Sequence, residues 1–455
     1  MKQKSTNQEW HSRSKNWIKG MLVICGLLPP LAVAGNSMMA VTDADYPARN
    51  EAKEELGKLL FYDKILSGNR NTSCATCHHP LAATGDGLSL SVGEGGRGLG
   101  VMRDTGSGSD AVHERVPRNA PHLFNLGANE FVTMFHDGRV QKNDEASTGF
   151  DTPAGENFLL GIDSALAAQA AFPPTSNTEM AGQLGENAVA NAAAAGDVKE
   201  VWRLLTERVV AISEYQELFA RAYPEVNVPQ EVTYTHIANA IGAFEAAAYR
   251  ADNSPFDRHL RGENLAMSGR AKLGLRLFKG KAQCTTCHSG KFQTDHQFHV
   301  LGMPQIGPGK GDGLNGHDDF GREQVTGDWN DRYKFRTPTL RNVAITGPWG
   351  HDGAYNTLDA VIKHHLDPMN GLYAYDVTQA VLPSREDLDA IDFEIYEDSN
   401  SRSSLASAIE IEPVMLSDEE IQLLTDFLHA LTDPASLDMR ATAPARVPSG
   451  LPLAD

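Results

Sequence analysis

Apolar side chains recur at helical spacing in several long stretches of the chain. Apolar residues three and four positions apart, with polar residues between them, are typical of a helix with one buried face. The pattern predicts a helix at 51–62, one or two at 198–222, a long one at 233–250, and others at 266–278 and 417–432. The last begins with the capping pair Ser417 and Glu420. Strand patterns are sparse, so a mainly α fold is predicted.

Three segments between these helices lack a regular pattern. Residues 85–108 are rich in glycine and 303–331 hold many Gly and Asp residues, so both are predicted to be loops. Residues 369–412 resemble an irregular insertion, with the polar stretch 397–404 predicted to be partly disordered. The predicted helices are therefore separated by long irregular stretches.

Four sequence features occur twice in the same order, about 210 residues apart. They are a G-x-x-L-F, a C-x-x-C-H, a P-x-L-x-N and a His-Asp-Gly element. The first copies lie at 57–61, 74–78, 121–125 and 136–138, and the second copies at 274–278, 284–288, 338–342 and 351–353. The order predicts an internal duplication, with two related domains at 35–250 and 251–455.

The C-x-x-C-H element carries the strongest chemical signal. Two thiols at this spacing meet the two vinyl groups of one haem, and the next residue places an imidazole beneath the iron. A zinc site would need clustered Cys and His pairs, and a redox dithiol needs no following His. We therefore predict two covalently bound haem c groups, attached through Cys74, Cys77, Cys284 and Cys287, with His78 and His288 as axial iron ligands.

Composition narrows the class of protein. The chain has 455 residues, of which 41% are hydrophobic, and this is typical of soluble globular proteins with ordinary cores. Its formal net charge of −19 disfavours nucleic acid as a partner and favours a basic protein, such as a small electron-donor cytochrome.

The first 34 residues have the order of a secretory signal peptide. Basic residues precede an apolar run at 21–34, which ends in the small-residue sequence Ala32-Val33-Ala34. A retained membrane anchor is the alternative, and Pro29 and Pro30 disfavour it. Apart from Cys25 in this segment, every cysteine belongs to a haem motif, so no disulfide is expected. We expect an exported, periplasmic protein.

Taken together, these motifs resemble those of the bacterial di-haem cytochrome c peroxidase and MauG family. The similarity covers roughly 56–432 and rests on both haem motifs together with the segments 56–61, 135–139, 334–343 and 350–353. The resemblance implies two cytochrome c-like domains, in which the N-terminal haem reacts with hydrogen peroxide and the C-terminal haem transfers electrons. It also implies a homodimer.

The same resemblance assigns residues to the first haem. Glu179 matches the distal glutamate that moves a proton between the two peroxide oxygens. Peroxidases of the family carry a His sixteen residues after the first haem His, where it blocks the iron until the other haem is reduced. Here that position is Glu94, which implies an iron open without reductive activation. We group Glu94 with Glu179 as catalytic, and His79, His113 and His122 are alternative ligands.

At the second haem, the family places its sixth ligand fourteen residues after the His of the His-Asp-Gly element. That ligand is Met in peroxidases and Tyr in MauG, and the matching residue here is His365, with His364 and Met369 as alternatives. A helix predicted at 357–365 carries both histidines, so only one of them can face the iron. A second imidazole would lower the haem potential relative to a Met ligand.

Two further positions follow from the resemblance. Between the haems the family places a Trp before Asp-Gly-Arg, where this chain has His136, so Trp349 or Trp329 are alternative electron bridges. A calcium ion in the family is held by an Asn side chain and two carbonyl oxygens, which correspond to Asn119, Thr346 and Pro348.

Three functions fit these residues. The first is a peroxidase that takes electrons from a small cytochrome or cupredoxin. The second is a MauG-like enzyme that oxidises Trp or Tyr side chains of a partner protein through a high-valent di-haem state. The third is an electron-transfer cytochrome without turnover, which Glu179 and Glu94 disfavour.

Overall fold

Helices form where the apolar pattern predicts them. The computed structural model describes residues 38–108 and 111–454, so the predicted signal peptide at 1–34 lies outside the described residues. The five predicted stretches are confirmed to within three residues, as α1 (Glu51–Tyr62), α5 (Val198–Val210), α6 (Ser213–Ala222), α7 (Tyr234–Ala248), α9 (Gly269–Lys279) and α16 (Asp418–His429).

The other elements are short. The remaining helices are α2 (Cys74–Cys77), α3 (Ala165–Gln169), α4 (Ala188–Ala194), α8 (Pro255–Leu260), α10 (Glu323–Thr326), α11 (Leu358–Leu366), α12 (Pro368–Tyr373), α13 (Glu386–Asp389), α14 (Glu394–Glu397) and α15 (Ser399–Ala408). Strands β1 (Thr133–Met134), β2 (Val140–Lys142) and β3 (Phe150–Asp151) form one antiparallel sheet, and β4 (Phe298–His299) pairs with β5 (Phe335–Arg336). The mainly α fold is confirmed. Within the described ranges, none of the helices has the length and apolar character that crossing a membrane requires.

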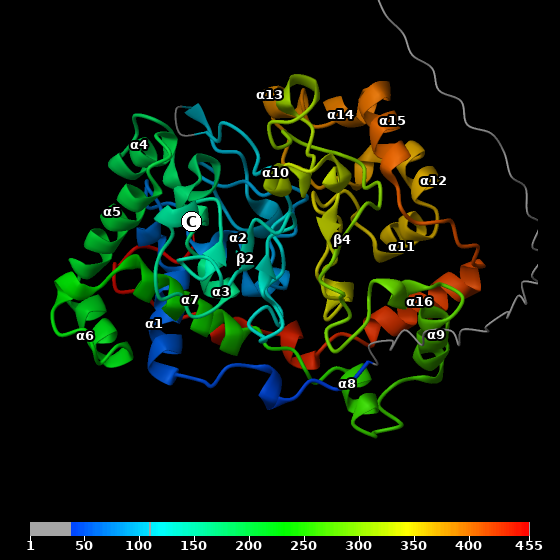
Figure 1. Cartoon of the computed structure of the whole chain (residues 1–455), viewed down its shortest axis with the longest axis horizontal. Coiled ribbons are helices and arrows are strands. Elements are labelled where there is room, and N and C mark those ends of the chain that lie inside the picture. Colours follow the sequence, from blue (N-terminus) through cyan, green and yellow to red (C-terminus); the bar gives the residue numbers. More distant parts are fainter. Residues whose placement is uncertain (1–37, 109–110, 455) are drawn as a thin grey trace, which may run out of the picture. The chain divides into compact units, whose positions relative to one another are not determined.

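Two long helix pairs support the haem motifs. In Figure 1, α1 lies beside α7 and α9 lies beside α16. Glycines allow the close approach in both pairs. A Cβ atom on Gly57 of α1 would lie 1.8 Å from Ala240 O, and one on Gly274 of α9 would lie 1.9 Å from Leu423 O. The glycine of each G-x-x-L-F element is therefore the contact point of its helix pair.

The apolar cores follow these pairs. The largest cluster contains Leu60 and Phe61 of α1 and is built mostly from residues between 41 and 251. A second cluster contains Phe278 of α9 and Phe427 of α16 and lies mostly between 256 and 431. Phe292 joins the first cluster from the second half of the chain. The domain limits 35–250 and 251–455 stay a prediction.

The predicted disorder at 397–404 is wrong. Residues Ser399–Ala408 form α15, whose first turn is capped by the Asp398 carboxylate, which accepts hydrogen bonds from two backbone N–H groups. Leu405 is buried in a small cluster with Val300 and Tyr333. The helix has a weak apolar pattern of its own, and its stability comes from residues distant in sequence. The insertion that was predicted to be irregular thus contains α12 to α15, whereas 85–108 is a loop as predicted.

Candidate haem sites

The first haem motif forms a short capped helix with its histidine at the end. The backbone N–H of His78 donates to Cys74 O at 2.9 Å, and its ring Nδ1 lies 3.0 Å from Thr84 O. A carbonyl only accepts, so Nδ1 carries the proton and Nε2 keeps the lone pair that binds iron. Burial lowers the pKa of His78, so the ring is held neutral, as a metal ligand must be.

The second motif repeats this arrangement. The N–H of His288 donates to Cys284 O at 2.8 Å, and its Nδ1 lies 3.1 Å from Gln293 O. Burial lowers the pKa of His288 to about 4, with the nearby His365 adding to the effect. Both motif histidines therefore present Nε2 in the same way.

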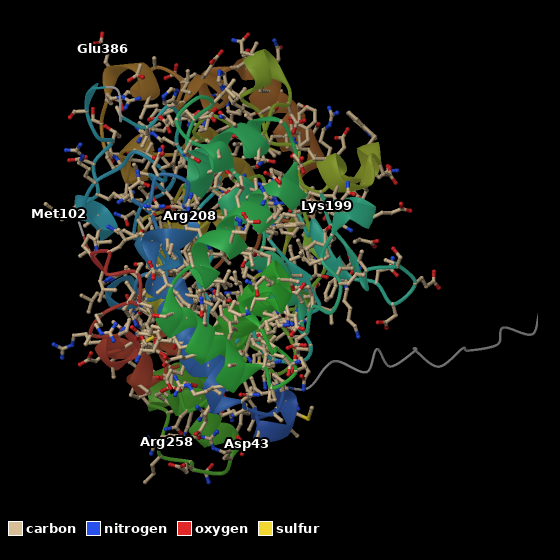
Figure 2. The ribbon with its side chains drawn as sticks, turned by 90° about the vertical axis from the view of Figure 1, so that its left-hand side faces the viewer. Asp43, Met102, Lys199, Arg208, Arg258 and Glu386 are labelled. Atoms are coloured by element: carbon tan, nitrogen blue, oxygen red, sulfur yellow. The ribbon has the colours of Figure 1, made fainter. Side chains whose placement is uncertain are left out.

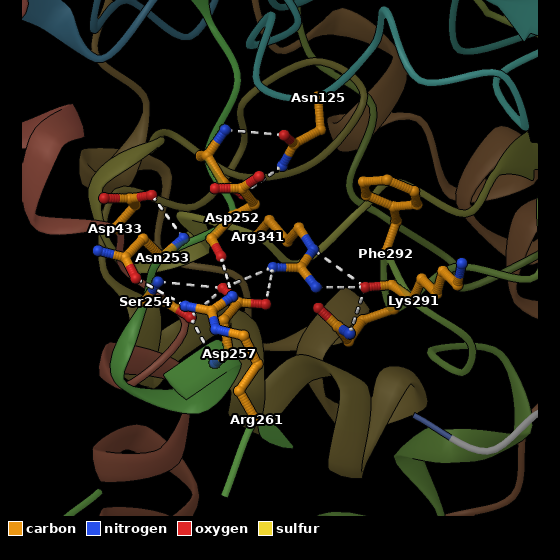
Figure 3. Close-up of polar contacts among 12 residues, drawn as sticks. Asn125, Asp252, Asn253, Ser254, Asp257, Arg261, Lys291, Phe292, Arg341 and Asp433 are labelled. Carbon is orange, nitrogen blue, oxygen red and sulfur yellow. Dashed lines mark hydrogen bonds and ion pairs between the residues drawn. The ribbon is translucent and has the colours of Figure 1, made fainter. Parts of the chain in front are cut away.

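The loop after the second motif is held by a buried ion pair (Figure 3). Nη1 of Arg341 donates to the two carboxylate oxygens of Asp257 at 2.7 and 2.8 Å, and its Nε and Nη2 donate to Lys291 O. Lys291 lies two residues before Gln293, whose carbonyl accepts from His288. The pair therefore helps to fix the orientation of the axial imidazole.

The four motif cysteines suit thioether attachment. All are free thiols in the structure, and burial raises the pKa of Cys77 and Cys284 to about 12. Cys287 lies with Asp295 and His299 in a group of potential metal ligands, the ligand atoms within 4.8 Å of one another. The C-x-x-C-H motif assigns this sulfur to a predicted haem thioether, so we do not interpret the trio as a separate metal site.

Unpartnered buried polar atoms also fit a haem. Nε of Arg336 donates to Phe135 O at 3.2 Å, but its buried Nη1 has no hydrogen-bond partner among the described residues. Burial lowers the pKa of Arg336 to about 10. The buried Nδ1 of His122 is likewise unpartnered within the described ranges, and the charge of Arg336 acts on this ring. A buried guanidinium nitrogen without a hydrogen-bond acceptor fits a haem carboxylate. Arg336 was not among the predicted haem residues, although it lies in the 334–343 motif.

Glu179 lies on a turn close to the first pair of thiols. Ser176 caps this turn by accepting from Glu179 N–H at 3.2 Å, and Gly182 ends it with a φ of 87°. Burial raises the pKa of Glu179, while the charges of Arg139 and Lys310 oppose the rise. After burial and Asp86, the carboxylate of Glu179 is among the groups that raise the pKa of Cys77, so it acts on the haem attachment point.

Glu94 is also buried, but its carboxylate is engaged. One oxygen accepts from Asn69 Nδ2 at 2.8 Å and from Asn71 Nδ2 at 2.7 Å. Its backbone N–H donates to Thr178 O at 3.0 Å, next to Glu179. These bonds favour a positioning role for Glu94 over proton transfer, and its grouping with Glu179 as catalytic stays a prediction.

The three residues predicted as alternative ligands of the second haem have different surroundings. The ring centroids of His365 and His288 are 6.4 Å apart, and Nδ1 of His365 lies 2.8 Å from Val361 O. With metal–imidazole bonds of about 2 Å on either side of one ion, ring centres lie roughly 6 Å apart. His364 is engaged at both nitrogens, by Leu301 O and Tyr355 Oη, each at 2.8 Å, and the Met369 side chain is 43% exposed.

The predicted bridge residues lie in three different settings. His136 is half-buried, with Nε2 3.1 Å from Asn119 O, and burial lowers its pKa to about 4. Trp349 donates to Val343 O at 2.9 Å and packs against the second core cluster. Trp329 is 65% exposed, with the guanidinium of Arg332 4.1 Å from its ring centre. Of these, His136 and Trp349 have the burial expected of a bridge.

Two of the three residues predicted to hold calcium, Asn119 and Thr346, line a small cavity. Nδ2 of Asn119 donates to Leu88 O at 2.9 Å, which leaves the side-chain oxygen for another partner. Asn119, Thr346 and Gly347 line a cavity of about 10 Å³, and Gly347 precedes Pro348. This volume holds one water-sized particle.

Comparison with known proteins agrees with the motifs and the geometry. Residues 51–265 match the family model for di-haem cytochrome c peroxidase. The methylamine utilization protein MauG of Methylorubrum extorquens is 31% identical over 318 residues, which cover 69% of this chain and 68% of that protein. The cytochrome c551 peroxidase of Pseudomonas aeruginosa is 29% identical over 313 residues, covering 69% of this chain and 71% of that protein.

A solved structure has the same fold over most of the chain. The crystal structure of a MauG-like protein associated with microbial copper homeostasis superposes with a TM-score of 0.55 at 26% identity, covering 89% of this chain and 95% of that chain. Two C-x-x-C-H motifs with identically oriented histidines fit the two haem c groups that such a family implies. The chain therefore belongs to the di-haem cytochrome c peroxidase and MauG family of oxidoreductases.

Proposed function

We propose that the protein uses hydrogen peroxide at the haem bound by His78 and moves electrons through the haem bound by His288. The observation that carries this proposal is the difference between the two sites. A half-buried acid, Glu179, acts on the thiol of Cys77, and an imidazole, His365, lies at ligand distance from the second histidine. The predicted signal at 1–34 supports a periplasmic location.

Glu179 is the proposed proton carrier. When bound, the haems supply the redox chemistry of peroxide reduction, which takes two electrons and two protons per molecule. The charged carboxylate of Glu179 accepts the proton of the peroxide oxygen nearer the iron and returns it to the departing oxygen. Burial raises the pKa of Glu179 above its ordinary value, which makes this carboxyl easier to protonate than an exposed Glu. Arg336 and His122 would bind haem carboxylates.

His365 is the proposed sixth ligand of the second haem. The ring spacing of 6.4 Å supports it, and the two bonds of His364 disfavour the neighbouring residue. Replacing His365 by Ala should convert the second haem from a low-spin to a high-spin spectrum without altering the first. His364→Gln is the control, because His364 is not the proposed iron ligand. A low-spin spectrum retained in His365→Ala would reject the assignment.

We also propose that the two halves arose by duplication. Asn125 and Asn342, the last residues of the two P-x-L-x-N elements, have left-handed φ values of 63° and 62°. The side-chain oxygen of each accepts a backbone N–H at 2.8 Å, from Ala251 in the first half and from Asp433 in the second. These bonds, with the paired glycines of α1 and α9, support a common ancestor for the halves.

A calcium ion between the halves is proposed on the cavity beside Asn119. Its size suits a single ion, and the Asn119 side-chain oxygen and the carbonyls of Thr346 and Pro348 are the proposed ligands. The ion would connect the loop before the first His-Asp-Gly element to the segment before the second.

The electron source separates two versions of this function. Electrons from a small cytochrome or cupredoxin would make the protein a peroxidase, whereas electrons from Trp or Tyr side chains of a partner protein would make it MauG-like. Glu94 in place of a blocking His favours the second, because the first haem then needs no prior reduction.

Rapid mixing of the fully oxidised protein with peroxide tests the proposal. A MauG-like enzyme should show a long-lived spectral change at both haems, and a peroxidase open in its oxidised form should react and then return on addition of a donor protein. Reaction only after one-electron reduction would exclude the MauG-like version, and no reaction in either state would refute peroxide use.

A further inference from the structure

A segment of the second half of the chain contacts the glycine-rich loop of the first half. We define the glycine-rich loop as residues 85–108 and 111–116 and the clasp as residues 381–392. Arg115 of the loop is 1% exposed, and its Nε and Nη2 each donate to a carboxylate oxygen of Asp392 at 2.9 Å. Its Nη1 donates to Pro383 O at 2.9 Å. A two-pronged guanidinium–carboxylate pair fixes both distance and orientation, so the end of the loop is rigidly attached.

Further contacts join the same two segments. Arg385 of the clasp donates to Val112 O at 2.6 Å and to Thr105 O at 3.3 Å. Ser89 and Val381 exchange two hydrogen bonds, from Ser89 N–H to Val381 O at 3.0 Å and from Val381 N–H to Ser89 Oγ at 2.8 Å. The clasp therefore contacts the loop near its beginning, in its middle and at its end.

An apolar contact runs beneath these bonds. Leu88, Val92 and Val112 of the loop form a separate buried cluster with Leu388 of the clasp. Figure 2 shows the two segments on one side of the molecule, where Met102 marks the loop and Glu386 marks the first residue of α13 in the clasp. Burial of this cluster adds a contact that does not depend on charge.

The inner edge of the loop lies against the turn that carries Glu179. The N–H of Glu94 donates to Thr178 O at 3.0 Å. A Cβ atom on Gly93 would lie 2.2 Å from Thr178 O and 3.0 Å from Glu179 Cα, so loop and turn are in direct contact. Arg103 stiffens the loop by donating to Gly93 O at 2.7 Å. The loop thus connects the clasp to the proposed proton carrier.

We propose that Arg115 and Arg385 are positioning residues for the first haem site. They hold the loop against the Glu179 turn and maintain the hydrogen bonds of Glu94 to its two Asn partners. The proton carrier is therefore already in position when peroxide binds to the oxidised protein. No loop has to move first. This inference rests on the proposed role of Glu179, and it gives a structural basis for reaction without reductive activation.

Arg385→Ala and Arg115→Lys test the proposal in the holoprotein. Arg385→Ala removes two bonds to the loop, and Arg115→Lys keeps the charge but loses the two-pronged pair. We expect hydrogen exchange in peptides covering 93–95 and 178–180 to become at least tenfold faster, and peroxide reaction with the oxidised protein at least tenfold slower. The pH profile should shift to lower pH, because water entering the turn lowers the raised pKa of Glu179.

Arg402→Ala is the matched control. Arg402 lies in the same insertion, and it donates to Tyr396 O at 2.8 Å within that insertion. We expect exchange, rate and pH profile to match the wild type. If Arg115→Lys does not fold, Arg385→Ala decides the matter alone, because Arg385 is only half-buried.

The outcomes are distinguishable. Wild-type exchange and pH profile in Arg385→Ala would overturn the proposal. Faster exchange with an unchanged rate and pH profile would show a merely structural contact and also overturn it. An unchanged rate of peroxide reaction in Glu179→Gln would refute the proposed function of Glu179. The contact between the clasp and the loop is measured separately, by hydrogen exchange.

Discussion

The two haem sites share one side and differ on the other. On the shared side, the Nδ1 atoms of His78 and His288 each lie about 3 Å from a backbone carbonyl a few residues further on, at 3.0 and 3.1 Å. On the other side, we propose the half-buried carboxyl of Glu179 for the first site and the imidazole of His365 for the second. The C-x-x-C-H motif therefore determines which cofactor binds, and residues from distant segments determine what that cofactor can do.

The His-Asp-Gly elements show the same divergence in their charge. Burial alone would raise the pKa of Asp137, but the charges of Arg118 and Arg139 outweigh it and hold this pKa well below its usual range. Asp352 accepts from backbone N–H groups at 3.1 and 3.2 Å and has Nε2 of His351 at 3.9 Å, and burial raises its pKa to about 8. One motif thus carries a fixed anion in the first half and an acid that is neutral at pH 7 in the second.

The largest effect should come from the proton carrier of the first site. Replacing Glu179 by Gln keeps the shape but removes the ionisable group, and we expect peroxide reaction at pH 7 to slow by about 10²–10⁴-fold. Stopped-flow absorbance of the holoprotein measures this rate. Because the folded pKa of Glu179 is raised, the wild-type rate should fall as pH drops through a value above the usual range of a Glu.

Glu94→Gln is the matched comparison. Its amide oxygen can still accept from Asn69 and Asn71, so we expect less than a tenfold change in rate. A large loss of rate in both variants would make Glu94 a second proton-transfer residue. A small effect on the rate in both variants would remove the proposed chemical difference between the two haem sites.

The two Asp residues should differ in how they link stability to pH. Asp352 has a folded pKa above its unfolded value, so the folded state binds the extra proton and stability falls as pH rises from about 4 to about 8. Asp352→Asn should therefore reduce this slope, by up to roughly 1.4 kcal/mol per pH unit. Urea unfolding of the holoprotein at several pH values measures the difference.

Asp137→Asn should leave the slope in that window unchanged. Its folded pKa is lowered, so its contribution is complete above about pH 4 and is lost only as pH falls further. The variant should instead lower stability uniformly at neutral pH, since Arg118 would keep only Asp319. Buried Glu245, whose pKa burial raises to about 8, adds to the slope in every variant and cancels in the comparison. Equal slopes in wild type and Asp352→Asn would remove the contrast.

The sequence was informative wherever local pattern decides structure. α1 and α16 were predictable because their apolar faces and capping residues are local, and the haem motifs because their chemistry needs fixed spacing. α15 was not, because its burial depends on Val300 and Tyr333. The choice between His364 and His365 depends on how α11 is rotated against Tyr355, which adjacent positions in a sequence do not reveal.

The contacts of the clasp could not be predicted from the sequence pattern either. Arg115 and Asp392 are separated by 277 positions, and nothing in either neighbourhood marks them as partners. Arg336 lies inside a recognised motif, yet only its buried Nη1 atom, which is unpartnered within the described structure, points to a further hydrogen-bond acceptor there. Long-range polar contacts of this kind are set by the packing of whole elements and have no local signature.

The smallest expected effect tests the similarity of the two halves. Gly57→Ala and Gly274→Ala each place a methyl group within 2 Å of a carbonyl oxygen on the partner helix, at 1.8 Å from Ala240 O and 1.9 Å from Leu423 O. Because both helices must move apart by a similar amount, we expect similar losses of stability, of about 1–3 kcal/mol each. Gly269→Ala at the exposed start of α9 is the control, since a Cβ there meets no atom within 4 Å. Denaturant unfolding with haem absorbance as the probe compares the three variants. A large loss of stability for one glycine variant and none for the other would show that the α1–α7 and α9–α16 pairs tolerate separation differently. The helix pairs that support the two haem motifs would then not be equivalent.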